Sequence, residues 1–246
     1  MNRIKALTVR NIKETLREPM SLVFCVIFPL VMLVMMELIL GGVEDHGATV
    51  FKIDNFAPGI AVFGYTFTML FIAIGIASDH NSAFMTRISV SPLKPIEYYV
   101  SFVFAFLPVC VVQTVLFFAV ALAFGMHFSA GILVAIVYLL PSALFYISCG
   151  LFIGTVAPTE KAAGPISSIF ICGAGLLGGI WMPVETLGGS FFNICKALPF
   201  FNTVKPAASA VTESYSDIVP CVFITLTYTA AILFVCSAVF RVKNKK

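Results

Sequence analysis

The sequence lacks charge over a long central stretch, because no Asp, Glu, Lys or Arg occurs between Tyr98 and Thr159. A transmembrane helix needs about 20 apolar residues to cross the hydrocarbon core of a bilayer. The stretch is therefore long enough for two crossings, and we expect the turn between them at Gly125-Met126-His127. A helix that is apolar all round must be covered by protein or by lipid. This absence of charge excludes an ordinary soluble domain and predicts a multispanning membrane protein.

Charge is also scarce in the whole chain, where 11% of the residues are charged and the mean hydropathy is +1.02. A typical globular domain has about 25% charged residues. Transporters driven by protons or ions usually keep ionisable groups at mid-membrane, but the apolar runs contain only Glu37, at the outer end of the first. We expect Glu37 to face water, and we expect Gln113 to form hydrogen bonds between helices.

Sequence motifs for catalysis are missing as well. The chain has no G-x-x-x-x-G-K-[ST] for nucleotide phosphates, no H-E-x-x-H, no G-x-S-x-G and no C-x-x-C pair. Its three histidines fall on different predicted loops, which does not favour a metal site. The chain is therefore not expected to be an enzyme or to hold a cofactor or metal of its own. Any energy source for its activity should lie in another subunit.

What is present is a series of apolar runs that predicts an all-α membrane protein with six transmembrane helices. We interpret residues 1–246 as a single transmembrane domain with short connections. The predicted spans are Met20–Leu40, Ala57–Ala77, Val100–Phe124, Gly131–Val156, Ala162–Met182 and Val219–Phe240.

Lysine and arginine determine the expected orientation. With the N-terminus in the cytoplasm, only Lys52, Lys196 and Lys205 of the 15 lysines and arginines lie outside. This bias agrees with the positive-inside rule, and it predicts a multi-pass protein of the plasma membrane with both termini in the cytoplasm. A cleaved signal peptide is the competing interpretation, but the first apolar run begins only at Met20, and no A-x-A site follows it.

Residues 1–18 predict an amphipathic helix in the membrane interface, and Pro19 separates it from the first span. Two interpretations remain open: the helix only anchors the chain, or it also contacts a cytoplasmic partner. Its apolar half contains Ile4, Leu7, Ile12 and Leu16, and its basic half contains Arg3, Arg10, Lys13 and Arg17.

The longest predicted cytoplasmic connection covers residues 78–99. Asp79 is a suitable N-cap for a short helix, and Ser91-Pro92 would end it. Phe84 and Ile88 would share one face, with Arg87 beside them. Such a helix suits a groove on a cytoplasmic protein. The alternative is an amphipathic connector that only lies on the membrane.

The longest outer segment covers residues 183–218 and exceeds a simple connector. Gly188-Gly189 and Pro199 interrupt an otherwise apolar sequence. The segment predicts one or two short helices that re-enter the outer leaflet, where non-helical backbone must be covered by protein or line a cavity. Its apolar residues include Phe191, Phe192, Ile194, Leu198, Phe200 and Phe201.

Several short motifs resemble the ABC-2-type permease family in their order and spacing. They are Arg87–Leu93 (RISVSPL), Gly150–Gly154 (GLFIG) followed by Pro158–Ala163 (PTEKAA), Gly178–Leu187 (GGIWMPVETL) and Leu198–Asn202 (LPFFN). The N-terminal helix, the six spans and the outer segment extend this resemblance over essentially the whole chain.

The resemblance implies a mechanism and a set of partners. Two permease chains, identical or related, would pair with two separate P-loop ATPase subunits, which bind ATP and magnesium. The helix after the second span would transmit the ATPase motion, with contacts at Asp79, Phe84, Arg87, Ser91 and Pro92. Gly175 and Gly179 form a G-x-x-x-G that favours helix packing or dimerisation. The outer re-entrant turn would include Trp181, Pro183, Glu185 and Pro199.

We therefore expect the membrane subunit of an ATP-binding-cassette exporter for an amphipathic substrate such as a drug, a lipid or a peptide. The expected partners are the ATPase, a second permease chain and the bilayer, with no nucleic acid. Two other classes remain: a stand-alone channel or secondary transporter, and a membrane immunity or scaffold protein that transports nothing. Both of these would function without nucleotide hydrolysis.

Overall fold

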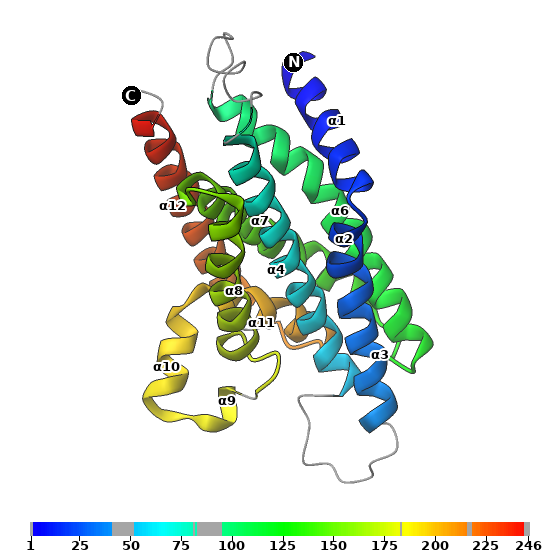
Figure 1. The fold of residues 1–246 in the computed structure, drawn as a ribbon. Coiled ribbons are helices and arrows are strands. Elements are labelled where there is room, and N and C mark those ends of the chain that lie inside the picture. Colours follow the sequence, from blue (N-terminus) through cyan, green and yellow to red (C-terminus); the bar gives the residue numbers. More distant parts are fainter. Residues whose placement is uncertain are drawn as a thin grey trace.

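The structure is a computed structural model that describes residues 2–40, 52–80, 82, 95–182, 184–215 and 218–243. All regular elements within these residues are helices, as Figure 1 shows. This confirms the predicted all-α class.

The N-terminal part forms one short helix followed by one long helical rod. Helix α1 covers Asn2–Arg17, as the amphipathic pattern predicts. The rod consists of α2 (Pro19–Leu22), the π-helical turn η1 (Val23–Ile27) and α3 (Phe28–Leu40). Proline suits the first turn of a helix, where its missing N–H would have no intrahelical partner. Pro19 therefore both separates α1 from the rod and begins the rod.

The long central helices are α4 (Ile53–His80), α6 (Pro95–Ala123), α7 (Ala130–Val156) and α12 (Ile218–Lys243). A tight turn joins α6 to α7, as the sequence predicts. Gly125 takes a φ of 100° in this turn, a conformation that glycine adopts at little cost.

Within the described residues, five helices are long and apolar enough to cross a membrane: Pro19–Ile39, Ile53–His80, Ile96–Ala123, Ala130–Val156 and Ile218–Val239. They support a multi-pass membrane protein. The sixth predicted span, Ala162–Met182, is not among them. It corresponds to α8 (Glu160–Leu177), which is shorter and begins with the charged pair Glu160-Lys161.

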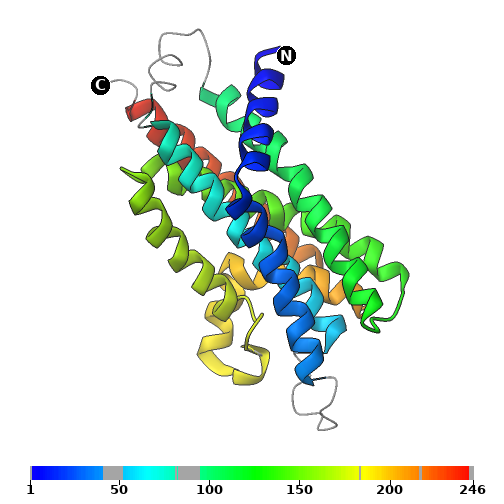
Figure 2. The same ribbon diagram turned by 45° about the vertical axis from the view of Figure 1, so that its right-hand side comes forward.

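The outer segment forms α9 (Val184–Leu187), α10 (Gly189–Ala197) and α11 (Pro199–Val211) instead of one or two helices. Figures 1 and 2 show the start of α1 and the ends of α4 and α12 at one end of the bundle, and α9 at the other. We call these the α1 end and the α9 end. Helix α8 runs beside α4 between them.

Helix α4 is the centre of the bundle, because 78% of its most apolar window is buried, against 17% for the rod of α2, η1 and α3. It packs against α6, α7, α8 and α11. Gly150 and Gly154 of α7 allow a close approach of α7 to α4. A Cβ at Gly154 would lie 2.7 Å from the Cβ of Ile76, and one at Gly150 would lie 2.7 Å from the carbonyl oxygen of Met69. Small residues at this spacing let two helix backbones approach closely.

Side-chain hydroxyls add hydrogen bonds between helices. The Ser142 hydroxyl of α7 donates to the Thr203 carbonyl of α11 at 2.8 Å, and the Thr225 hydroxyl of α12 donates to the Asn202 carbonyl at 3.1 Å. Helix α11 is thereby held between α7 and α12. Gln113 differs from the expectation: it is fully buried beside Gly64, and its amide has no hydrogen-bond partner among the described residues.

Candidate functional site

The first candidate site is a charged cluster at the α1 end, formed by the partly exposed Arg10 and the buried Asp79 and Tyr98, which we call the Arg10 network. The two terminal nitrogens of Arg10 donate to the two carboxylate oxygens of Asp79 at 2.9 and 2.6 Å. The Tyr98 hydroxyl donates to the same carboxylate at 2.8 Å. A two-pronged pair of this kind fixes orientation as well as distance. It joins α1, the last turn of α4 and the first turn of α6.

Further polar contacts hold α1 along α6. Asn11 is buried and donates through its side-chain nitrogen to the Ser101 hydroxyl at 3.2 Å, and the Thr8 hydroxyl donates to the Ser101 carbonyl at 3.4 Å. Burial alone would lower the pKa of Arg10, but the hydrogen bonds and the charge of Asp79 outweigh it, and the pKa is raised. Arg10 therefore stays charged, and its guanidinium binds α1 to the end of α4.

This arrangement corrects two sequence interpretations. Asp79 does not cap the start of a new helix, because α4 continues through it to His80. Arg10, which was placed in the basic half of an interfacial helix, is paired with a carboxylate of α4 whose side chain is only 8% exposed. Both errors have one cause: a buried pair 69 positions apart in the chain leaves no local pattern.

The other predicted coupling residues, Phe84, Arg87, Ser91 and Pro92, lie outside the described residues. Ser82 is described, and its amide and hydroxyl both donate to the Asp79 carbonyl, at 3.1 and 2.8 Å. The chain therefore leaves α4 directly from the Arg10 network. The predicted coupling role of these residues remains a prediction.

Beside the network lies a cavity of about 820 Å³ between α1, α2, α4 and the start of α8. Three cations and three carboxylates line it, so its wall has no net charge. These residues are Arg10, Lys13, Arg17, Glu14, Glu18 and Glu160. A wall of mixed charge suits a polar surface rather than an apolar ligand.

The predicted G-x-x-x-G of Gly175 and Gly179 is not a helical motif, because α8 ends at Leu177 and Gly179 has a φ of 77° in the following turn. Gly175 is covered by the chain's own Trp181, since a Cβ there would lie 2.6 Å from the indole ring. Trp181 also packs edge-on against Phe56 and Phe63 of α4, at ring distances of 5.9 and 5.3 Å. The motif with this spacing that packs two helices is Gly150–Gly154.

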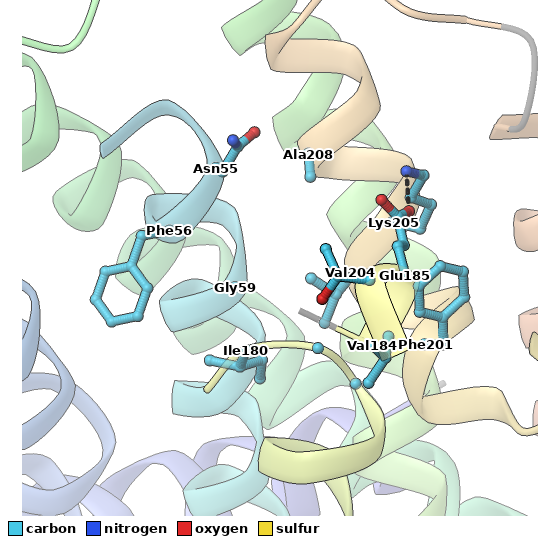
Figure 3. Close-up of a pocket in the computed structure, with 13 residues that line it drawn as sticks. Asn55, Phe56, Gly59, Ile180, Val184, Glu185, Phe201, Val204, Lys205 and Ala208 are labelled. Atoms are coloured by element: carbon cyan, nitrogen blue, oxygen red, sulfur yellow. Dashed lines mark hydrogen bonds and ion pairs between the residues drawn. The ribbon is translucent and has the colours of Figure 1, made fainter. Parts of the chain in front are cut away.

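The second candidate site is a cavity of about 190 Å³ at the α9 end, which we call the α9 cavity. Figure 3 shows Asn55, Phe56 and Gly59 of α4 on one side, with α9 and α11 on the other. Apolar side chains such as Ile180, Val184 and Val204 form much of its wall. The N-terminal end of α4 therefore lines the α9 cavity, while its C-terminal end belongs to the Arg10 network.

An ion pair joins two walls of the α9 cavity. Glu185 of α9 accepts a hydrogen bond from the amine of Lys205 on α11, marked by the dashed line in Figure 3. Pro199 begins α11 and is buried. Pro183 lies outside the described residues. Sequence reasoning placed Glu185 in this turn but missed Lys205, for which the one available signal was a cation in an otherwise apolar segment.

The geometry allows a mechanical link rather than bond chemistry. Helix α4 reaches from the Arg10 network to the α9 cavity, and helices pack around it on several sides. At about 1.5 Å per residue, its 28 residues span about 42 Å. A shift of its α1 end would therefore move Asn55, Phe56 and Gly59 at the far end.

Comparison with known proteins agrees with this architecture. Residues 2–214 match the family model described as ABC-2 type transporter. No curated protein matches the chain. The match covers most of the sequence, includes both candidate sites, and confirms the resemblance given by the motifs. The chain therefore belongs to the ABC-2 type transporter family.

Proposed function

We propose that this chain is the permease subunit of an ATP-driven exporter. It moves an amphipathic substrate such as a drug, a lipid or a peptide outward, powered by a separate P-loop ATPase. The observation that supports this most is the Arg10 network, which binds the end of the most buried span to an amphipathic helix. The family implies an ATPase partner and a membrane location.

In this proposal the α1 end faces the cytoplasm and the ATPase. The segment that leaves α4 after Ser82 contacts the ATPase through Phe84, Arg87, Ser91 and Pro92. Asp79 acts as a positioning residue rather than as a contact, because its carboxylate already binds Arg10 and Tyr98. Closure of the ATPase dimer then pulls α1 and α4 together as one unit.

Helix α8 is the sixth crossing in this proposal, and α9–α11 form the outer re-entrant segment. At about 1.5 Å per residue, the 18 residues of α8 span about 27 Å, which is close to the thickness of the hydrocarbon core. The less apolar side of α8 is shielded because it packs against the bundle, where its buried residues are Ala163, Ser167, Ala174 and Gly175. Six crossings place both termini in the cytoplasm of the plasma membrane.

A second copy of the chain, or a related permease, completes the transporter in this proposal. Outward transport is favoured because the described residues form no outer domain that could receive a ligand from a binding protein. Substrate would then pass between the two permeases and leave near the α9 end of each.

The test is co-expression with a P-loop ATPase, purification in mild detergent and reconstitution into vesicles. We expect the two proteins to purify together and to move a lipophilic fluorescent dye only when ATP is present. Arg87→Glu and Phe84→Asp should abolish dye movement while ATP hydrolysis continues. Lys196→Glu, which reverses a cation at the α9 end, is the control and should have no effect.

Two outcomes would contradict this proposal. Dye movement by the purified chain without any ATPase would favour a channel or secondary transporter. Normal dye movement by both Arg87→Glu and Phe84→Asp would make residues 78–99 a simple connector.

A further inference from the structure

Helix α9 is a short element held against the bundle by two features. Its first residue, Val184, is buried in a small apolar cluster with Cys195 and Phe201, separate from the main core. Its second residue, Glu185, pairs with Lys205 of α11. The remaining residues of α9 are exposed. Val184 therefore faces the bundle, and the rest of the helix lies at the surface.

The backbone that follows α9 is suited to a hinge. Gly188 and Gly189 have φ values of 58° and 60°, in the region that favours glycine. A Cβ at either position would meet nothing within 4 Å. Lack of space is therefore not the reason for glycine at these positions. The reason is the positive φ, which residues with a side chain rarely adopt. They separate α9 from α10 at a point with no steric restraint.

The α9 cavity lies directly behind this helix, since Val184, Glu185 and Thr186 line it together with Lys205 and Ala208 of α11. Figure 3 shows the Glu185–Lys205 pair joining α9 to α11 on the side of the cavity opposite α4. Both side chains are partly exposed, Lys205 at 27% and Glu185 at 50%. Ion pairs in such positions are weak and are exchanged easily.

We propose that α9 is a hinged cover of the α9 cavity, that the Glu185–Lys205 pair holds it closed, and that its opening lets substrate leave at the outer face. The part of this inference that concerns release rests on the proposed function. The hinge and the closing pair do not, because they depend only on contacts within the chain.

Cys195 is a built-in reporter of this opening. It is a free thiol, fully buried in the cluster beneath Val184, and burial raises its pKa. A maleimide reacts with the thiolate of an accessible cysteine, so the rate at Cys195 follows the fraction of molecules with α9 open. The exposed Cys172 is replaced by serine in all variants, and labelling is assigned to each cysteine by mass spectrometry, with the buried Cys149 as the internal reference.

We expect Lys205→Met and Glu185→Gln each to raise the labelling rate of Cys195 by roughly two- to fivefold, the range that corresponds to a partly exposed ion pair. The two single variants distinguish an opening of α9 from a direct effect of nearby charge on the reactivity of the Cys195 thiolate. Loss of a nearby cation should slow a thiolate reaction and loss of an anion should speed it, whereas loss of the closing pair speeds both. The charge-swapped double variant, Glu185→Lys with Lys205→Glu, should restore the slow rate. Lys196→Met, next to the reporter, gives the size of the electrostatic effect alone.

Three results would overturn the inference. The first is single variants that change the rate in opposite directions or leave it unchanged, and the second is a double variant as fast as the singles. The third is an unaltered protein whose Cys195 reacts as fast as it does after unfolding in SDS. A final arm adds the ATPase and ATP in vesicles, where labelling should rise during turnover. Hydrolysis in an intact complex without such a rise would show that α9 does not control release. Failure of any ATPase to bind would contradict the proposed function and leave the first arm valid.

Discussion

The two ends of α4 are held in opposite ways. At the α1 end, Asp79 is almost fully buried and is bound by Arg10 and Tyr98. At the α9 end, the helix lines a cavity whose far walls are joined by the partly exposed Glu185–Lys205 pair. Both pairs are ionic and connect distant segments, but their environments differ.

The difference in burial sets the energetic scale of each pair. Removing one partner of a buried ion pair leaves an uncompensated charge and costs about 3–5 kcal/mol. An exposed pair contributes roughly 0.2–1 kcal/mol, because water and salt screen it. At the α1 end, the strong pair is therefore suited to make α1 and α4 move together. At the α9 end, the weak pair is suited to let α9 open and close. The predictions below test this contrast, from the largest expected effect to the smallest.

Asp79→Ala should have the largest effect. It removes the buried carboxylate that accepts from both Arg10 and Tyr98, and it leaves the guanidinium of Arg10 with the exposed carboxylate of Glu14. We expect a loss of about 3 kcal/mol in the free energy of unfolding, at the low end of the range because Arg10 is 29% exposed. Unfolding in mixed detergent–SDS micelles measures it.

The control for this prediction is Glu14→Gln, which removes the other carboxylate bound to Arg10, at 3.0 Å and 62% exposed. Its effect should stay below about 0.5 kcal/mol. Equal losses in both variants would show that burial does not distinguish the two carboxylates, and the contrast between the ends of α4 would lose its basis.

Gly154→Ala tests whether α4 is held as a rigid rod between its two ends. The new methyl group would lie 2.7 Å from the Cβ of Ile76 and 2.8 Å from the Ala73 carbonyl oxygen, so α7 must move away from α4. We expect Gly154→Ala to lower the free energy of unfolding by about 1–3 kcal/mol. Gly75→Ala in α4 is the matched control, because its Cβ would meet nothing within 4 Å. For Gly75→Ala we expect the free energy of unfolding to stay the same or to rise by up to about 1 kcal/mol, because alanine has the higher helix propensity. A loss at Gly75 comparable to that at Gly154 would contradict close packing as the cause.

Gln113→Leu tests the middle of the bundle, where the buried amide has no partner among the described residues. Replacing an unsatisfied polar group by an apolar one of similar size should raise the free energy of unfolding by about 1 kcal/mol. The neighbouring Thr114→Val should instead lower it by a similar amount, because the Thr114 hydroxyl bonds to that of Tyr65. If Gln113→Leu is destabilising, the amide has a partner in the membrane.

Much of the fold could be predicted from the sequence, because it follows from apolar length and from turn-forming residues. The Gly125 turn, the start of the rod at Pro19 and the long spans are local properties of the chain. The boundary of α4 was predicted three residues too early at Ala77, because Asp79 was interpreted as the N-cap of a new helix. A carboxylate can extend an apolar helix when a distant cation neutralises it, and only tertiary structure shows that cation.

The candidate sites were less predictable for the same reason. Two G-x-x-x-G patterns occur, Gly150–Gly154 and Gly175–Gly179, and spacing alone does not tell which of them faces another helix. The structure assigns the packing role to the first, since the second extends past the end of α8. Lys205 illustrates the wider limit. Its partner Glu185 is 20 positions away across three short helices, so neither residue predicts the other.

The smallest expected effect comes from exchanging charges within each pair. Lys205→Met should lower the free energy of unfolding by only about 0.5 kcal/mol, and the double variant Glu185→Lys with Lys205→Glu should recover it, because partly exposed side chains can readjust in water. The same exchange at the other end, Arg10→Asp with Asp79→Arg, should recover little. The Asp79 site is buried and holds a short carboxylate that accepts from Tyr98, so the much larger guanidinium of an arginine there would be overpacked. Equal recovery at both ends would show that the Arg10 network is as adaptable as the Glu185–Lys205 pair, and rigid transmission through α4 would then need another origin.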